Sequence, residues 1–133
     1  MEGVQENVQQ PEHPTIVRID SVRFGDENMT GRVKLVCVEV VGEHAGTILQ
    51  LWCNMRNEDG LLSPAMKLYT LLEAGHGEGW TKKFDSLEVA IQALRGKFIA
   101  GTSVPKDKSK GGVGNNLKDG SIMSVPDDFE PAA

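Results

Sequence analysis

The sequence lacks the features that identify membrane and secreted proteins. None of its apolar runs approaches the ~20 residues that a membrane-spanning helix needs. The first residues have neither the basic nor the apolar region of a secretory signal, so we expect a reducing, cytoplasmic location and no membrane partner. In that compartment the two cysteines, Cys37 and Cys53, are expected to be small buried side chains rather than a disulfide.

Motifs for catalysis and for metal or cofactor binding are also lacking. The cysteines form no CxxC pair, and His44 and His76 form no HxxxH pair, which argues against a metal site. The glycines of 111–114 are not followed by the Lys and Ser or Thr of a P-loop. The glycines of 75–79 follow an expected helix rather than a strand, unlike a dinucleotide fingerprint. We therefore expect no enzymatic activity, no cofactor and no metal.

Acidic residues outnumber basic ones by 19 to 14, which gives a net charge of −5. The two ends hold much of the negative charge: residues 1–14 carry three carboxylates and residues 119–133 carry four, without Lys or Arg. Residues 15–118 hold all 14 basic residues and the other 12 acidic ones, a net charge of +2. A mildly basic body between acidic ends is compatible with a polyanionic partner.

Strand patterns dominate the first half of the chain. Residues 15–24 read as a strand whose apolar side chains change face after Ile19, which predicts a β-bulge near Asp20 and Ser21. Residues 31–55 contain two apolar runs, over 32–41 and 47–55, joined by a five-residue loop with two glycines. This pattern is typical of a long β-hairpin.

The second arm of this hairpin alternates clearly between two faces. Leu49, Leu51 and Cys53 point one way and are expected to face the core. Trp52 then points outward, with the polar Gln50 and Asn54 beside it. The alternative is that Trp52 packs beneath a helix or a terminal segment.

Two helices are expected after the hairpin. Ser63 and Pro64 form a helix start, and an apolar stripe continues to a stop at Ala74-Gly75. A second helix begins at the capping-box residues Asp85 and Glu88 and ends at Gly96. Trp80, in the connector between the helices, is expected to anchor that connector. Strands follow over 97–104 and, interrupted at 119–120, over 115–125.

These elements predict a mainly β fold with helices, in the order β-β-β-α-α-β-β, over a domain of residues 15–125. A disordered lead of residues 1–14 and an acidic tail of residues 126–133 flank it. Three strands, a helical crossover and two strands are the order of the five-stranded OB-fold barrel. Since that barrel usually has one helix between strands 3 and 4, the second helix is either an insertion or a sign of a different α+β fold.

This layout, together with short patches at 42–46 (GEHAG), 66–72 (MKLYTLL) and 94–98 (LRGKF), resembles OB-fold single-stranded-DNA-binding proteins of bacteriophages and prophages. The resemblance implies non-sequence-specific binding of single-stranded DNA in replication or recombination, in the cytoplasm of a host cell. RNA as the ligand and assembly into a homo-oligomer stay open. A rival interpretation is a protein-interaction module, such as a phage accessory factor or an inhibitor of a host enzyme, that uses the same sheet.

Aromatic and basic residues are the candidates for nucleic-acid contacts, because bases stack on aromatic rings and phosphates bind cations. OB-folds use the face of strands 2 and 3 and the 1–2 and 4–5 loops. Core packing of Phe98 and simple solvation of the cations are the alternatives. The predicted nucleic-acid-binding residues are Arg32, Lys34, Trp52, Arg56, Lys97, Phe98, Lys106, Lys108 and Lys110.

The acidic tail contains Asp127, Asp128, Phe129 and Glu130. It resembles the C-terminal tails with which single-stranded-DNA-binding proteins recruit replication and repair proteins, although Phe129 is not the last residue here. Two alternatives stay open: the tail only aids solubility, or it occupies the basic groove and competes with DNA.

Overall fold

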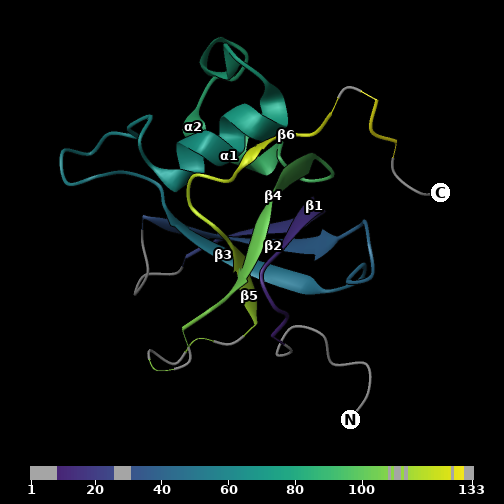
Figure 1. Ribbon diagram of the computed structural model, residues 1–133. Helices are drawn as coiled ribbons and strands as arrows, with labels where there is room; N and C mark the ends of the chain where they lie inside the picture. Colours follow the sequence, from purple (N-terminus) through teal and green to yellow (C-terminus); the bar gives the residue numbers. More distant parts are fainter. Residues whose placement is uncertain are drawn as a thin grey trace.

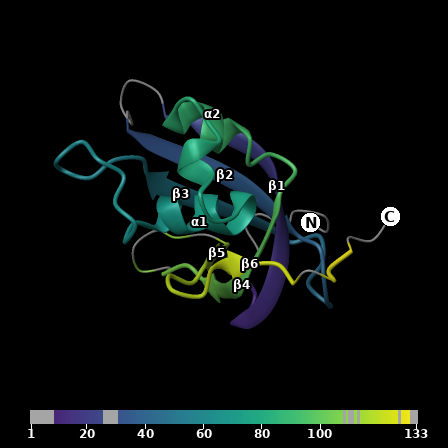
Figure 2. The same ribbon diagram turned by 90° about the horizontal axis from the view of Figure 1, so that it is seen from above.

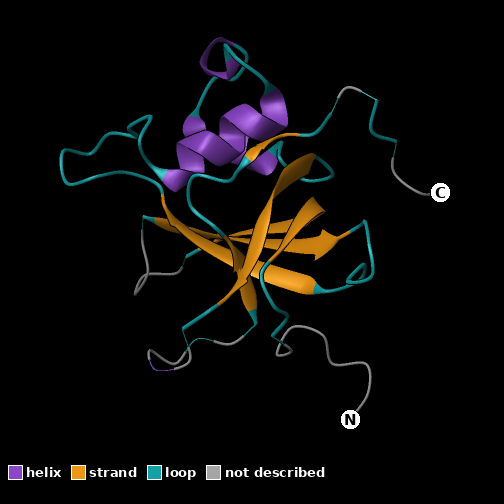
Figure 3. Cartoon of the chain, in the orientation of Figure 1, coloured by secondary structure: helices purple, strands orange, loops and turns teal. Residues whose placement is uncertain are grey.

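The computed structural model describes residues 9–25, 31–107, 109, 112, 114–126 and 128–130. The strands are β1 (His13–Phe24), β2 (Arg32–Glu39), β3 (Ile48–Asn54), β4 (Phe98–Pro105), β5 (Asn115–Leu117) and β6 (Met123–Ser124). The helices are α1 (Lys67–His76), the single 3₁₀ turn η1 (Trp80–Lys82) and α2 (Leu87–Gln92). The strands form a barrel, and the helices lie together over one end of it (Figures 1 and 3).

Five of the strands close into a barrel. The sheet order is β1-β2-β3-β5-β4-β6, and an additional pairing between β1 and β4 completes the circle. The short contact of β3 with β5 is parallel, whereas the other pairings are antiparallel. The predicted mainly β fold with a five-stranded, OB-fold-like barrel is thus confirmed. β6 pairs with β4 outside this circle and is a separate piece of the interrupted last strand.

β1 contains the predicted bulge. Its register with β2 shifts between Ile19 and Ser21. Before the shift Ile19 is fully buried, and after it Val22 and Phe24 pack against the same core. The extra residue therefore keeps apolar side chains on the inner face along the whole strand.

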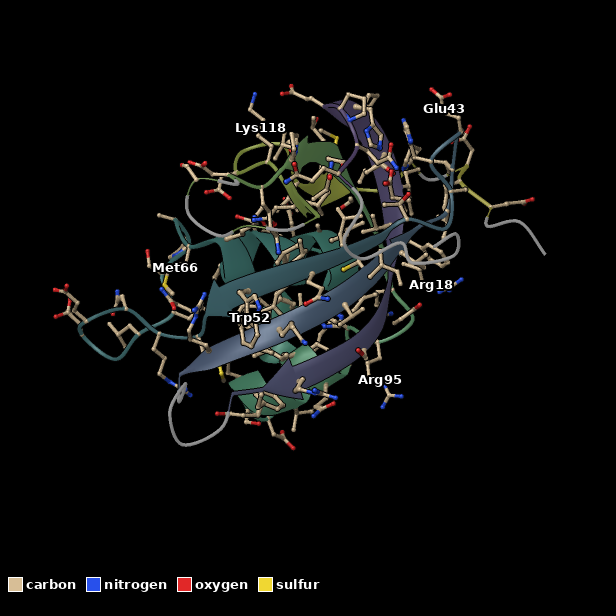
Figure 4. All side chains as sticks on the ribbon, turned by 90° about the horizontal axis from the view of Figure 1, so that it is seen from below. Arg18, Glu43, Trp52, Met66, Arg95 and Lys118 are labelled. Atoms are coloured by element: carbon tan, nitrogen blue, oxygen red, sulfur yellow. The ribbon has the colours of Figure 1, made fainter. Side chains whose placement is uncertain are left out.

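The hairpin faces agree with the alternation of the sequence. Leu49 and Leu51 are fully buried and Cys53 is nearly so, whereas Gln50 and Trp52 are half-buried on the outer face. In Figure 4 the Trp52 side chain lies on the outer face of the strands and does not pack beneath a helix.

α1 begins and ends later than expected. Ser63 does not cap the helix but forms a separate turn, in which its carbonyl oxygen accepts a hydrogen bond from the Met66 N–H at 2.9 Å. The expected stop at Ala74-Gly75 is wrong, because α1 continues to His76 and ends at Gly77, whose φ is 92°. Gly75 is a packing residue instead: a Cβ there would lie 2.6 Å from Leu94 Cδ2.

α2 is an addition to the barrel rather than the sign of a different fold. Its N-cap is Ser86, whose side chain accepts a hydrogen bond from the Val89 N–H, and not the expected Asp85. Ala90, Ile91 and the following Leu94 are fully buried in the core. Seen from above, α1 and α2 cover the end of the barrel side by side (Figure 2).

Trp80 anchors the connector between the helices. It is only 5% exposed and packs edge-on against Tyr69 of α1, with 5.4 Å between ring centroids. Among the described residues, no helix is long and apolar enough to cross a membrane.

The described part of the N-terminal segment packs on the barrel. β1 starts at His13, two residues before the expected boundary. The Gln9 side chain donates to the carbonyl oxygens of Lys106 and Gly114, at 2.8 and 3.1 Å. The Gln10 N–H donates to Asn115 Oδ1 at 2.9 Å. Residues 9–14 are thus ordered against the barrel, and residues 1–8 of the expected lead lie outside the described residues.

An ion pair joins the start of β1 to the end of β2. His13 Nε2 lies 2.6 Å from an oxygen of buried Glu39, and Nδ1 lies 2.6 Å from the Pro11 carbonyl oxygen. The Pro11 carbonyl oxygen and an ionised Glu39 are both acceptors, so this arrangement favours the charged imidazolium, in which both ring nitrogens donate. Burial opposes that charge, but the hydrogen bonds to Pro11 and Glu39 and the charges of Glu39 and Glu43 outweigh it and raise the pKa of His13.

We expect the free energy of unfolding to decrease as the pH rises above the 6.5 of an ordinary histidine. A raised pKa in the folded state stabilises the protein fully below the unfolded value, and this contribution is lost as the pH rises through the folded value. His13→Gln should abolish this loss of stability at alkaline pH, which we call the alkaline loss. Urea unfolding between about pH 5.5 and about pH 8.5 measures it.

His76 provides the matched control, because its pKa is shifted the other way. Burial lowers the pKa of His76, and the charges of Lys97 and Lys83 add to this, against the hydrogen bond to the Ala90 carbonyl oxygen. The contribution of His76 to the free energy of unfolding is present above pH 6.5 and is lost as the pH falls. His76→Gln should therefore leave the loss of stability at alkaline pH unchanged. An equal alkaline loss in His13→Gln and the wild type would contradict our interpretation of the ion pair.

Candidate functional site

Trp52 lies on the outer face of β3, and the start of α1 borders this face. Seen from below, its indole points outward from the middle of the strands (Figure 4). Its neighbours Leu51 and Cys53 point into the core, so the alternation of β3 forces Trp52 outward. A half-buried aromatic ring on an open sheet face is a surface on which a flat ligand can stack.

The strand register places basic residues beside this ring. Lys34 of β2 pairs with Trp52, and Arg23 of β1 pairs with Lys34, so the three lie in one row across three strands. Lys34 Nζ is 5.6 Å from the indole centroid, and Arg32 Cζ is 5.3 Å from it. Such cation–π contacts contribute about 0.5–1 kcal/mol each at exposed sites. We call Arg23, Arg32, Lys34 and Trp52 the Trp52 cluster.

Lys106, in the segment after β4, is a further cation, outside the Trp52 cluster. Burial lowers the pKa of Lys106, and the charges of Lys67 and Lys34 lower it further. Among the described residues, neither Lys34 nor Lys106 forms an ion pair with a carboxylate. Lys34 on β2 and Lys106 in the 4–5 loop are therefore two cations whose charge no described carboxylate compensates.

A groove of about 290 Å³ lies directly beside Trp52, where the end of β3 meets the start of α1. Within it Lys67 is held in place: Nζ donates to Asn116 Oδ1 at 3.0 Å and to the Leu117 carbonyl oxygen at 2.6 Å, and it pairs with Asp119 at 3.1 Å. These contacts tie α1 to β5. The residues that line the groove are Trp52, Cys53, Asn54, Met66, Lys67 and Leu68.

Sequence reasoning missed both the groove and the role of Arg23. The Lys67 tie joins residues about fifty positions apart, and no local pattern indicates such a contact. Arg23 is not among the predicted contact residues, because its place in the row depends on the β1–β2 register. A signal for Arg23 was present in the predicted bulge, which sets the face on which it lies.

Two predicted cations lie away from the Trp52 cluster. Arg56 pairs with Glu88 next to α2, at 3.4 Å, and lines a different pocket. Lys97 is exposed and lies beside the C-terminal end of α1, where its charge lowers the pKa of His76. The groove beside Trp52 is at the opposite end of α1, about 15 Å away for a ten-residue helix. The structure does not bring these residues together with Trp52.

Phe98 is engaged by the tail instead of being open to a ligand. Its ring is half-buried, and the ring of Phe129 packs on it with 5.4 Å between centroids. Asp128 and Glu130 on either side of Phe129 are exposed. Predicted residues Lys108, Lys110 and Asp127 lie outside the described residues.

A pocket of about 370 Å³ lies at the helical end and not at the Trp52 cluster. Trp80, Tyr69 and Phe84 give it aromatic walls. Its one cation, Arg56, is already paired with Glu88, and Asp85 adds a further negative charge to the lining. This pocket therefore lacks the uncompensated positive charge that a polyanion requires.

No group of metal-ligating side chains is present among the described residues. Burial raises the pKa of the Cys53 thiol to about 11 and that of the Cys37 thiol still further. Both thiols therefore stay protonated and poorly reactive at neutral pH.

The chain matches no family model, and neither the curated proteins nor the solved structures contain a significant match to it.

Fluorescence quenching tests whether the electrostatic potential at Trp52 is positive. We expect iodide to quench tryptophan emission more strongly than caesium, because the cations around Trp52 concentrate anions near its indole. Trp80 is too buried to contribute much. Lys34→Gln should bring the two quenching constants closer together, and Trp52→Phe should remove most of the iodide effect. Equal quenching of the wild type by both ions at low salt would contradict a positive potential at Trp52.

Proposed function

We propose that this protein binds single-stranded DNA without sequence preference across the outer face of β1, β2 and β3, and protects or presents single strands during replication or recombination. The observation that carries the proposal is the cross-strand row of Arg23, Lys34 and Trp52. The OB-fold-like barrel supports it, because this fold commonly binds oligonucleotides on the same face.

The row combines the two interactions that single-strand binding requires. A base stacked on an aromatic ring contributes about 1–3 kcal/mol whatever its identity, since every base has a flat face. Cations beside the ring neutralise the phosphates that flank the stacked base. Two strand spacings of about 4.8 Å separate Trp52 from Arg23, so base and phosphate contacts fall within about 10 Å.

The negative net charge of the chain does not oppose this function. Charges more than about 8 Å apart are largely screened in physiological salt, so a bound strand responds to the local field. Around Trp52 that field comes from Arg32 and Lys34, with Arg23 in the same cross-strand row. Many of the carboxylates lie instead in the two ends of the chain.

One observation favours a second candidate, a protein-interaction module that uses the same sheet. The outer face continues beyond Trp52 with the half-buried apolar side chains Val36, Val38 and Ile48. An apolar strip beside an aromatic and charged cluster is also the composition of a protein-binding surface. A stoichiometric protein partner that survives nuclease treatment would favour this candidate.

Binding of labelled oligo-dT, followed by anisotropy, tests the proposal. Affinity should decrease steeply with salt, with a slope of about 0.7 per phosphate neutralised, and Lys34→Ala should lower the slope by about that amount. Trp52→Ala should weaken binding roughly 5- to 150-fold with little change in the slope. An oligo-rU arm reports whether a 2′-hydroxyl is tolerated.

Lys82→Ala and Trp52→Phe are the matched controls for this experiment. Lys82 is an exposed cation in η1 at the helical end, so its loss should change neither affinity nor slope. Phe keeps an aromatic face at position 52 and should retain most of the affinity. If the wild type does not bind oligo-dT at low salt, the proposal is wrong.

A further inference from the structure

The groove between β3 and α1 has the shape and the walls of a site for a flat ring. Trp52 forms one wall and Met66 stands beside it at the start of the helical region, on the same side of the molecule (Figure 4). Buried Cys53 and Leu68 line it from the core side. Its volume of about 290 Å³ is close to the ~300 Å³ lower limit of small-ligand pockets, which suits one planar group rather than a length of chain.

The side chains of the groove leave room for a ligand. The cations over Trp52 both come from β2, whereas the groove is lined only by residues of β3 and of the start of α1. Met66 is held in place because its sulfur accepts a hydrogen bond from the Ser63 N–H at 3.3 Å. Lys67 uses its three N–H groups on Asn116, Leu117 and Asp119, so it shapes the wall and is not a free ligand contact.

Asn54 supplies the polar group of the groove. It follows Trp52 by two residues on β3 and therefore lies on the same outer face. Its carboxamide makes no hydrogen bond to another described residue, and it can both donate and accept. Such a group pairs with the polar edge of a nucleobase, whose donors and acceptors differ from base to base.

We propose that this groove binds one unstacked nucleobase of the single strand, between Trp52 and Met66, with the base edge against the Asn54 carboxamide. The inference rests on the proposed function and deepens it. Lys34, whose Nζ lies 5.6 Å from the centroid of the Trp52 ring, is placed to contact a phosphate that flanks that base. The groove then gives a sequence-tolerant protein a modest preference among bases.

Homopolymer binding tests the inference on the full chain. Anisotropy with oligo-dT, oligo-dC and oligo-dA of about 15 nucleotides, within the ~4–16 nucleotide site of one OB-fold, gives three affinities at one salt concentration. Asn54→Ala should weaken binding of the tightest-bound homopolymer by about 2- to 10-fold, which corresponds to one net hydrogen bond. The differences among the three affinities should become smaller. Met66→Ala should weaken all three alike, because a thioether does not read base edges.

Gln92→Ala removes an exposed carboxamide from α2 and is the matched control, which should change nothing. Thermal unfolding of each variant must match the wild type, so that a lost affinity reports the groove. As a second measurement, a strand carrying 5-iodouracil should cross-link on irradiation to the peptides that contain Trp52 or Met66.

The outcomes separate the two proposals. If oligo-dT binds with full dependence on Trp52 and Lys34, but Asn54→Ala and Met66→Ala leave all three affinities unchanged, the groove inference is overturned and the proposed function stands. Cross-links confined to other peptides would overturn it equally. If no homopolymer binds the wild type, both proposals fail together.

Discussion

Barrel closure depends on one strand pairing with two others. β1 pairs through His13–Arg18 with β4 and through Val17–Phe24 with β2, so its two halves belong to opposite sides of the barrel. In a strand that bends between two sheets in this way, a one-residue change of register would move the apolar side chains from the core face to the outer face, because successive side chains point to opposite faces. The bulge between Ile19 and Ser21 adds the residue that corrects the phase. The His13–Glu39 ion pair joins the first residue of β1 to the last residue of β2.

The candidate site is a consequence of this closure. Since Val22 and Phe24 pack inward after the bulge, Arg23 between them must point outward, in register with Lys34 and Trp52. On the other side of β3, β5 makes a single parallel contact, and Lys67 at the start of α1 donates to the Leu117 carbonyl oxygen of β5. The Trp52 ring thereby has two cations from β2 near it and also lines the groove between β3 and the start of α1.

The two ends of the molecule have different chemistry. The helical end has an aromatic pocket whose only cation, Arg56, is neutralised by Glu88, while on the outer face of β1–β3 Arg32 and Lys34 lie over the ring of Trp52 without an ion pair to a described carboxylate. The tail covers Phe98 with Phe129 and so leaves Trp52 as the aromatic ring available on the sheet. A protein of net charge −5 can therefore offer a polyanion one local positive surface.

The sequence by itself determined the order of strands and helices along the chain, the bulge and the outward face of Trp52, because these follow from two-residue alternation and turn residues, which are local properties. The sequence misplaced the limits of α1, because Ser63 belongs to a separate turn and Gly75 packs on Leu94. It also treated Arg56, Lys97 and Phe98 as equivalent to Lys34. Only the tertiary structure decided which cations surround Trp52. That choice depends on the registers of β1, β2 and β3 and on the Lys67 tie between α1 and β5, and both are contacts between residues far apart in the chain.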